Sequence, residues 1–190
     1  MEKLKERIIA EGVVFPGNIL HVGSFLNQRI DTTLAKEMAK EIVRIYMGCN
    51  ITAVVTMEAS GIALAFAVAS VLTIPLVFAK KNKTANLGNN LLTSNIHSYT
   101  HQKDYIASLD ADFLTLEDTV LIVDDFLANG EAIRGMIDLI NQSGAKLIGC
   151  AIAIEKGFQG AGDRLRSEGI RVESLAIIES MSKEDGIVFR

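Results

Sequence analysis

The sequence predicts an α/β fold with a mostly parallel sheet flanked by helices. Short apolar segments of strand length alternate with amphipathic segments of helical length along most of the 190 residues. Hydrophobic residues make up 49% of the chain and aromatic residues only 6%, an aliphatic balance that is typical of layered α/β packing and excludes disorder. Because no repeat, low-complexity tract or Pro-rich linker divides the chain, we expect one domain over residues 1–190.

Two helices are predicted from apolar residues at helical spacing. The first has its apolar positions within residues 34–45, with an N-cap among residues 31–33 and Gly48 after its end. The second has them within residues 133–140 and is closed by Gly144. Between the helices, four apolar segments have strand length; they are residues 51–57, 76–79, 120–123 and 147–154. Strands separated by helices favour parallel pairing.

The pattern changes between residues 80 and 112. Residues 82–93 are rich in Asn and Gly, and we interpret them as a mobile loop that closes over a ligand. Residues 94–100 and 104–109 alternate like strands, so we expect an antiparallel hairpin at one edge of the sheet. His97 and His101 have a spacing that suits a metal on a helix, but the strand-like alternation argues against a metal site there.

One uncharged segment, residues 59–79, is long enough to cross a bilayer. Its Pro75 and small polar residues instead favour a helix over residues 62–72, a turn over 73–75 and a short strand after the turn. None of these pieces is long enough to span a bilayer, so we expect no membrane partner. The charged start over residues 1–7 has no apolar run behind it and predicts no secretory signal. We therefore expect a cytoplasmic protein.

Charge and cysteine usage exclude further classes. Nineteen Lys and Arg against 23 Asp and Glu give a net charge of −4, so no nucleic-acid partner is indicated. Cys49 and Cys150 stand far apart without a CxxC motif or a Cys/His cluster. Neither a disulfide framework nor a structural zinc site is predicted, which fits a reducing compartment. His21 is interpreted as structural.

The most informative segment is a buried strand that ends in Asp124 and Asp125, followed by a small-residue turn and a helix. In a parallel sheet this places the acids at the carboxyl edge, where ligands bind. Free backbone N–H groups over residues 128–132 suit a phosphate monoester. Adjacent residues leave a strand in opposite directions, so the two acids suit ribose hydroxyls, or magnesium through water, better than flanking one bond. The alternative is an ordinary turn in which Asp125 caps the helix and Asp124 is solvated.

A second turn of this kind follows another buried strand. Glu58, Ala59, Ser60 and Gly61 open the helix over residues 62–72 and form a second candidate anion cradle at the same edge. The alternative is a plain strand-to-helix turn with Ser60 as N-cap. Two such turns side by side predict a ligand with two phosphate groups.

The segment Asp-Asp-Phe-Leu-Ala-Asn-Gly after a buried strand resembles the phosphoribosyl pyrophosphate motif of the type I phosphoribosyltransferases. Other segments resemble the branch of this family that acts on xanthine. These segments are residues 11–14, 24–27, 58–63, 77–81, 90–93, 154–159 and 171–175. The resemblance implies transfer of a phosphoribosyl group from phosphoribosyl pyrophosphate to xanthine, giving xanthosine monophosphate and pyrophosphate.

The resemblance also implies the type I phosphoribosyltransferase fold and a role for each matching position. A small hood would come from about residues 1–30 and the C-terminal part. The ribose hydroxyls would lie on Asp124 and Asp125, which are the expected catalytic residues. The phosphoribosyl pyrophosphate phosphates would lie on Ala128, Asn129, Gly130, Glu131 and Ala132 and on Glu58, Ala59, Ser60, Gly61 and Lys81. The purine would lie against Leu20, Asn27 and Lys156. Mg²⁺ would be carried in with phosphoribosyl pyrophosphate, without direct protein ligands, and a homodimer is expected, as in related dimers.

The phosphate turn departs from the family pattern. Many relatives have Thr-Gly-Gly-Thr where this chain has residues 129–132, so two hydroxyl donors are lost. The phosphate must then rely on backbone N–H groups and on the Asn129 amide, and the carboxylate of Glu131 should point away.

Several alternatives stay open. Lys156 offers the donor and positive charge that the oxygens and acidity of xanthine require, or it pairs with Glu155 or solvent. Asn27 offers an amide to a purine edge, or it stabilises the following helix entry. Lys80 and Lys81 reach pyrophosphate, in their own subunit or a partner's, or form a solvated pair. The base is xanthine, or else hypoxanthine, guanine or adenine. A regulator that binds phosphoribosyl pyrophosphate without catalysis would need a DNA-binding segment and a basic face, and neither shows in the sequence.

Overall fold

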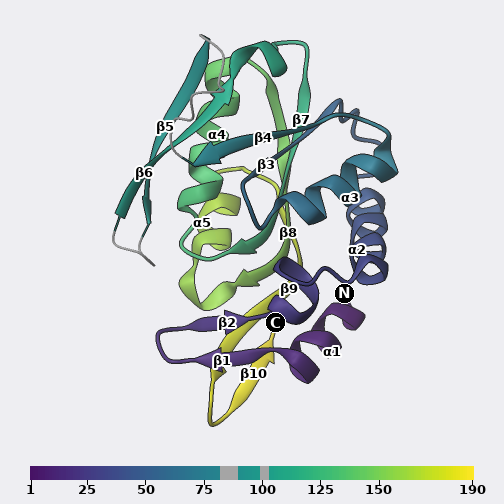
Figure 1. Cartoon of the computed structure of the whole chain (residues 1–190), viewed down its shortest axis with the longest axis vertical. Coiled ribbons are helices and arrows are strands. Elements are labelled where there is room, and N and C mark those ends of the chain that lie inside the picture. Colours follow the sequence, from purple (N-terminus) through teal and green to yellow (C-terminus); the bar gives the residue numbers. More distant parts are fainter. Residues whose placement is uncertain (82–89, 99–102) are drawn as a thin grey trace.

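The computed structural model describes residues 1–81, 90–98 and 103–190, and a central eight-stranded sheet runs through it (Figure 1). Five parallel strands form the centre of this sheet; in spatial order they are β9 (Val172–Ser182), β8 (Lys146–Lys156), β7 (Thr119–Leu127), β3 (Ala53–Met57) and β4 (Leu76–Lys81). Antiparallel strands close both edges; they are β10 (Gly186–Phe189) beside β9, and β6 (Lys103–Asp110) and β5 (Leu91–Ser98) beyond β4. The predicted fold class is confirmed.

Helices cover both faces of the sheet and divide its core in two. On one face, α2 (Thr32–Ile45) and α3 (Ile62–Leu72) pack against alternate residues of β7, including Leu121 and Val123. On the other face, α4 (Glu131–Ser143) and α5 (Ala161–Ser167) pack against the residues between them, including Val120 and Ile122. Burial on both faces explains why these strands read as continuous apolar runs.

The predicted strands of the parallel sheet are all present, but three of them are longer than expected, and β4 continues from Ala79 to Lys81. β7 continues from Val123 to Leu127, so the two acids lie inside the end of the strand and not after it. The reason is tertiary, because backbone pairing between β7 and β8 persists as far as Leu127 opposite Glu155. β8 likewise ends at Lys156 and not at Ile154.

The helix boundaries follow the predicted signals. Asp31 is the N-cap of α2, and its Oδ1 accepts from the backbone N–H groups of Thr33 and Leu34 at 3.0 Å. Gly144 ends α4 at φ 78°. The uncharged segment 59–79 forms a turn, α3 and the start of β4, as expected. None of the helices in the described ranges is long and apolar enough to span a membrane.

The edge hairpin is confirmed. β5 pairs antiparallel with β6, and β6 pairs with β4 through Lys80 opposite Ser108 and Lys81 opposite Ala107. Ile96 of β5 is buried in the core beneath α4. Residues 91–93 of the predicted loop belong instead to β5, because they pair with residues 108–110 of β6. Residues 82–89 of that loop, like residues 99–102, lie outside the described part of the chain.

The two ends of the chain meet in a hood at one end of the molecule (Figure 1). It contains α1 (Glu2–Glu11) and a small antiparallel sheet of β1 (Val13–Phe15) and β2 (Ile19–His21), which contact β9 and β10. The His21 ring packs against Phe15 with centroids 4.5 Å apart. A short turn of π-helix over Gly23–Asn27 leads from the hood into α2. Only the existence of the hood was predicted; β1, β2, β9, β10 and α5 were not.

Tyr46 joins the end of α2 to the sheet. Its side chain is buried, and its hydroxyl donates to the backbone carbonyl of Cys150 in β8 at 2.9 Å. We expect Tyr46→Phe to lower the free energy of unfolding by about 1–2 kcal/mol, because a buried carbonyl loses its donor. Urea denaturation would measure this loss. Substitution of Met47, whose side chain is exposed, by Leu serves as the control and should leave stability unchanged.

Candidate functional site

The two carboxylates at the end of β7 are buried, and each has defined donors. Asp125 accepts from two elements: its Oδ2 from the Asn27 side-chain amide at 3.0 Å, and its Oδ1 from the Ser60 hydroxyl at 2.9 Å. The Oδ1 atom of Asp124 accepts from the backbone N–H of Asp125 at 2.9 Å. The alternative of a solvated Asp124 and a helix-capping Asp125 is therefore wrong, and α4 has Gly130 as its N-cap without any side-chain cap.

Burial raises the pKa of Asp124 well above its usual range. The neighbouring carboxylate of Asp125 acts in the same direction, whereas the hydrogen bond from the Asp125 backbone and the positive charge of Lys81 oppose the shift. A cation or a set of hydroxyl donors brought by a ligand would stabilise the charged form.

The turn over residues 58–61 lies directly against these acids. A Cβ on Gly61 would lie 2.3 Å from Thr56 Oγ1 and 2.4 Å from Asp124 Oδ1, so only glycine fits here. Thr56 Oγ1 is buried and has no hydrogen-bond partner among the described residues. Ser60 bonds to Asp125 and does not cap α3, whose N-cap is Gly61. The alternative of a plain capped turn is wrong.

Glu58 fastens the same turn to the next strand. Its Oε1 accepts from the backbone N–H of Lys81 at 2.7 Å, and the peptide bond between Glu58 and Ala59 is cis. The Lys81 ammonium lies 5.4 Å from the centroid of the Tyr105 ring. Burial raises the pKa of Tyr105, and the charges of Asp124 and Glu131 add to the shift. Lys81 therefore belongs to the cluster around the acids, whereas Lys80 lines a separate groove that includes Phe78 and Phe113.

The second turn leads from β7 into α4. Gly130 has φ 93°, a conformation that L side chains rarely adopt, and a Cβ there would lie 3.1 Å from the Ala161 Cβ. Residues 128–132 contain no hydroxyl group, and no side chain caps the N-terminus of α4. Backbone N–H groups, the side-chain amide of Asn129 and the positive end of the helix are thus what this turn offers to an anion. The predicted orientation of Glu131 stays a prediction.

Lys156 and Phe126 extend the site toward the hood. The Lys156 ammonium donates to the backbone carbonyl of Asn18, in the β1–β2 turn, at 2.7 Å, and lies 5.6 Å from the centroid of the Phe126 ring. Burial lowers the pKa of Lys156. The alternative in which Lys156 pairs with Glu155 is wrong, because Glu155 bonds to Arg166 at 2.6 Å and to Ser174 at 2.5 Å.

The structure thus gathers most of the predicted positions at one edge of the sheet. Asn27, Ser60, Gly61 and Lys81 surround Asp124 and Asp125, the phosphate turn follows directly, and Lys156 lies beyond Phe126. Leu20 is buried in the hood, where its Cδ1 packs against Gly12. The amide of Asn27 bonds to Asp125 across 98 residues of sequence and not to the helix entry, so the alternative role for Asn27 is wrong.

Three further residues of the site were missed by the sequence reasoning. Two of them had a feature in the sequence that could have indicated them. Thr56 is a polar residue inside a buried apolar strand, and Phe126 directly follows the two acids. Tyr105 carried no such signal, because only the pairing of the edge hairpin brings it near β7.

The described residues contain no group of three or more His, Cys, Asp or Glu side chains that could hold a metal ion. His97 lies in β5, but its side chain and His101 fall outside the described part. Cys49 and Cys150 are both free thiols, and burial raises the pKa of Cys150 to about 12. A metal in this site would therefore have to be held largely by ligand and water oxygens.

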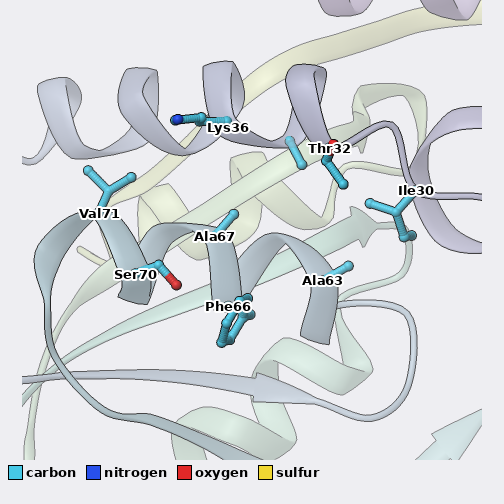
Figure 2. Close-up of a pocket in the computed structure, with 9 residues that line it drawn as sticks. Ile30, Thr32, Lys36, Ala63, Phe66, Ala67, Ser70 and Val71 are labelled. Atoms are coloured by element: carbon cyan, nitrogen blue, oxygen red, sulfur yellow. The ribbon is translucent and has the colours of Figure 1, made fainter.

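A second cavity lies between α2 and α3 and has a different character (Figure 2). It has a volume of about 550 Å³, and its lining is mostly apolar, including Ile30, Phe66 and Val71. Lys36 is the charged residue in this lining. The groove lacks the carboxylates and anion cradles of the sheet edge, so we place the chemistry at the sheet edge.

Comparison with known proteins agrees with this geometry. The model of the phosphoribosyl transferase domain family matches residues 21–178. A protein of Lachnoclostridium phytofermentans named xanthine phosphoribosyltransferase is 48% identical, covering 100% of this chain and 98% of the relative. One of the same name from Heliobacterium modesticaldum is 50% identical, covering 95% and 96%.

Solved structures share the fold. The adenine phosphoribosyltransferase of Rhodothermus marinus superimposes with a TM-score of 0.73 at 25% identity, covering 93% of this chain and 96% of that one. The adenine phosphoribosyltransferase of Saccharomyces cerevisiae gives 0.74 at 17% identity, covering 92% and 99%. With the family model covering most of its length and two close relatives matching it nearly from end to end, this chain belongs to the phosphoribosyl transferase family.

Proposed function

We propose that this protein transfers the phosphoribosyl group of phosphoribosyl pyrophosphate to xanthine, forming xanthosine 5′-monophosphate and pyrophosphate. The observation that carries the proposal is the Asp125 carboxylate, which bonds at once to Ser60 in one anion cradle and to Asn27 on the side of the hood. A ribose held on this carboxylate would have a diphosphate on one side and a base on the other. The names of the two close relatives support xanthine as that base.

The substrate would use the two turns as two phosphate sites. The 5′-phosphate would take the backbone N–H groups of residues 128–132, and the ribose hydroxyls would donate to Asp124 and Asp125. The diphosphate would lie on residues 58–61, with the Lys81 ammonium beside it. Opposed faces of β7 let the two acids hold adjacent hydroxyls without competing for the same atom.

Magnesium fits this site as part of the substrate complex. The acids offer hard oxygen ligands, but Asp125 already accepts two hydrogen bonds and Asp124 is buried, so we propose contact through water and substrate oxygens. Bound there, the ion would neutralise the leaving diphosphate. The chain contributes the carboxylates that orient the ribose.

The base would lie beside Phe126, with Lys156 at its edge. Xanthine carries oxygens at C2 and C6 and loses a proton near neutral pH, so a lysine both donates to it and balances its charge. The Lys156 ammonium would move from the Asn18 carbonyl to the base. The Phe126 ring offers an apolar face for stacking.

No side chain needs to act as a nucleophile in this reaction. The bond between ribose C1 and the diphosphate would loosen before the base nitrogen bonds to C1, so the protein acts by holding both reactants in line and stabilising the departing charge. The donors at the two turns are fixed in place, so they would stabilise the departing charge without reorganising during the reaction.

We further propose a cytoplasmic homodimer. The apolar groove between α2 and α3 supports association, because Phe66 is 65% exposed in its lining (Figure 2). Sedimentation of the wild-type protein and of its Phe66→Glu variant tests the homodimer. The wild type should sediment as a dimer and the variant as a monomer. A monomer at working concentration in both would contradict the proposal.

The function is tested by magnesium-dependent pyrophosphate release from phosphoribosyl pyrophosphate, with xanthine, hypoxanthine, guanine and adenine supplied separately. The highest kcat/KM should be with xanthine. Preference for another base would retain the phosphate sites and reject the base assignment. Release with none of the four would favour a regulator that binds phosphoribosyl pyrophosphate without turnover.

Replacing either acid should separate activity from stability. Asp124→Asn and Asp125→Asn should each lower kcat/KM by at least about 100-fold, because ribose hydroxyls lose a charged acceptor. Asp124→Asn keeps the acceptor for the Asp125 N–H and removes a buried charge, so the free protein should be at least as stable as wild type at pH 7. Unchanged turnover in either variant would refute the assignment.

The pH dependence of stability provides a further check on Asp124. Its folded-state pKa is raised, so its favourable contribution is complete below the unfolded-state pKa and is lost as pH rises through the folded-state pKa. Denaturation across pH 4–8 should show this loss in wild type and a smaller one in Asp124→Asn.

Removing the Lys156 side chain should change base preference. We expect Lys156→Ala to lower kcat/KM at least about tenfold more for xanthine than for hypoxanthine, since hypoxanthine lacks the second oxygen and the acidity. Steady-state kinetics with both bases measure the difference. Lys146→Ala, at the exposed opposite end of β8, is the matched control. Equal losses for both bases would contradict the contact.

Gly61→Ala tests the close approach of the turn to the acids. The added methyl would overlap Thr56 Oγ1 and Asp124 Oδ1, so the turn must shift and kcat should fall by about 100-fold. Gly48→Ala is the control, because its φ of 84° imposes strain while no atom lies within 4 Å of the added Cβ. It should lose stability but retain turnover, and a similar loss of kcat in both variants would count against the argument.

A further inference from the structure

Arg164 differs from most arginines in this protein because no described carboxylate pairs with it. Six other arginines each form an ion pair with an Asp or Glu; they are Arg7, Arg44, Arg134, Arg166, Arg171 and Arg190. Within residues 1–81, 90–98 and 103–190 no such pair involves Arg164, and its side chain is exposed. Its positive charge is therefore available to a ligand.

The guanidinium of Arg164 is directed at the phosphate turn. One terminal nitrogen donates to the backbone carbonyl of Asn129 at 3.4 Å, and the other to the carbonyl of Gln159 at 3.2 Å. Both distances are long for such bonds, and a guanidinium has five N–H donors. The close approach of Gly130 to Ala161 holds the start of α5, and with it Arg164, against this turn.

The turn over residues 128–132 contains no cationic side chain of its own. Residues 128–132 supply no hydroxyl donor and include the carboxylate of Glu131. Arg134, the nearest arginine along α4, is held by Glu168 through two bonds of 2.6 and 3.0 Å. Without Arg164, a phosphate dianion in this turn would meet backbone N–H groups, the neutral amide of Asn129 and the negative side chain of Glu131.

We propose that Arg164 is a binding residue for the 5′-phosphate of phosphoribosyl pyrophosphate, in place of the side-chain hydroxyls that the turn lacks. The inference rests on the proposed function, since it places that phosphate on residues 128–132. The planar guanidinium would exchange its two long bonds to carbonyls for bonds to phosphate oxygens, which match its geometry. The hydrogen bond from Arg134 lowers the pKa of Glu168, and the charge of Arg164 adds to this shift without forming an ion pair.

Direct binding of two partial ligands tests the assignment. Under the proposed function, ribose 5-phosphate would occupy the turn over residues 128–132 and pyrophosphate the turn over residues 58–61, so calorimetry on the full chain would measure the two sites separately. Arg164→Gln should weaken ribose 5-phosphate at least about tenfold and leave pyrophosphate affinity within twofold. Arg164→Lys should recover part of the loss, because it restores the charge without the planar fork.

The dependence of ribose 5-phosphate affinity on salt and pH distinguishes phosphate binding by Arg164 from a structural role of Arg164, which would not change either dependence. In wild type the affinity for ribose 5-phosphate should fall with added salt and rise from pH 5.5 to 7.5 as the phosphate gains its second charge, near pH 6 by analogy with phosphorylated side chains. Both dependences should be weaker in Arg164→Gln. Arg44→Gln removes the same charge from α2 and should behave like wild type.

The outcomes separate the two proposals. Unchanged ribose 5-phosphate binding in Arg164→Gln, with wild type binding both ligands, would overturn the role of Arg164 alone. An equal loss for pyrophosphate would also overturn it, since the variant would then have a general defect. Wild-type protein that binds neither ligand would overturn this inference and the proposed function together. If Arg164→Gln does not fold, Arg164→Lys and the wild-type salt dependence decide the matter.

Discussion

The burial of two adjacent carboxylates at the end of β7 is the constraint on which this site depends. A buried charge is costly unless other groups bond to it, so the surroundings of Asp124 and Asp125 must supply donors. Three separate parts of the chain do so: the turn before α2 through Asn27, the turn before α3 through Ser60, and β7 itself through a backbone N–H. The arrangement of the turns around the acids follows from that requirement.

The donors satisfy the two acids unequally. Asp125 accepts a bond at each oxygen, whereas Asp124 accepts from a neighbouring N–H, and burial raises its pKa. Close by, the hydroxyl of Thr56 is buried without a partner among the described residues. Such unsatisfied polar atoms are costly in a core, and they cluster where a ligand brings the missing bonds. In this protein the incomplete part of the network adjoins Gly61, whose lack of a side chain lets the turn approach Thr56 and Asp124 closely.

The hood and the sheet edge are linked by single side chains that span long stretches of sequence. Lys156 reaches the β1–β2 turn, and Asn27 reaches β7, so the hood and the sheet edge are joined through hydrogen bonds. α5 provides a further link, since Arg166 holds Glu155 next to Lys156 while Arg164 lies against the phosphate turn. Phe126 and Gly130 thus lie on neighbouring parts of one hydrogen-bonded framework.

The sequence by itself determined the fold class, four of the five central strands, the helices α2, α3 and α4, and the two turns beside the buried acids. Periodicity, cap residues such as Asp31 and the motif around Asp124 and Asp125 are local signals, and local signals survive in the sequence. It also predicted that Asn27, Lys81 and Lys156 matter, through resemblance to a family. Their partners could not be read from it, because a contact such as Asn27 with Asp125 depends on how distant elements pack.

Only the tertiary structure decided how far β7 extends, since its last four residues pair with β8 and have no apolar periodicity of their own. It also decided that Tyr105 lies near the acids and that Lys156 bonds to the hood and not to Glu155. The physical reason is common to these cases. Hydrogen bonds and burial link residues that are distant in sequence, and no local pattern records which distant group becomes the partner.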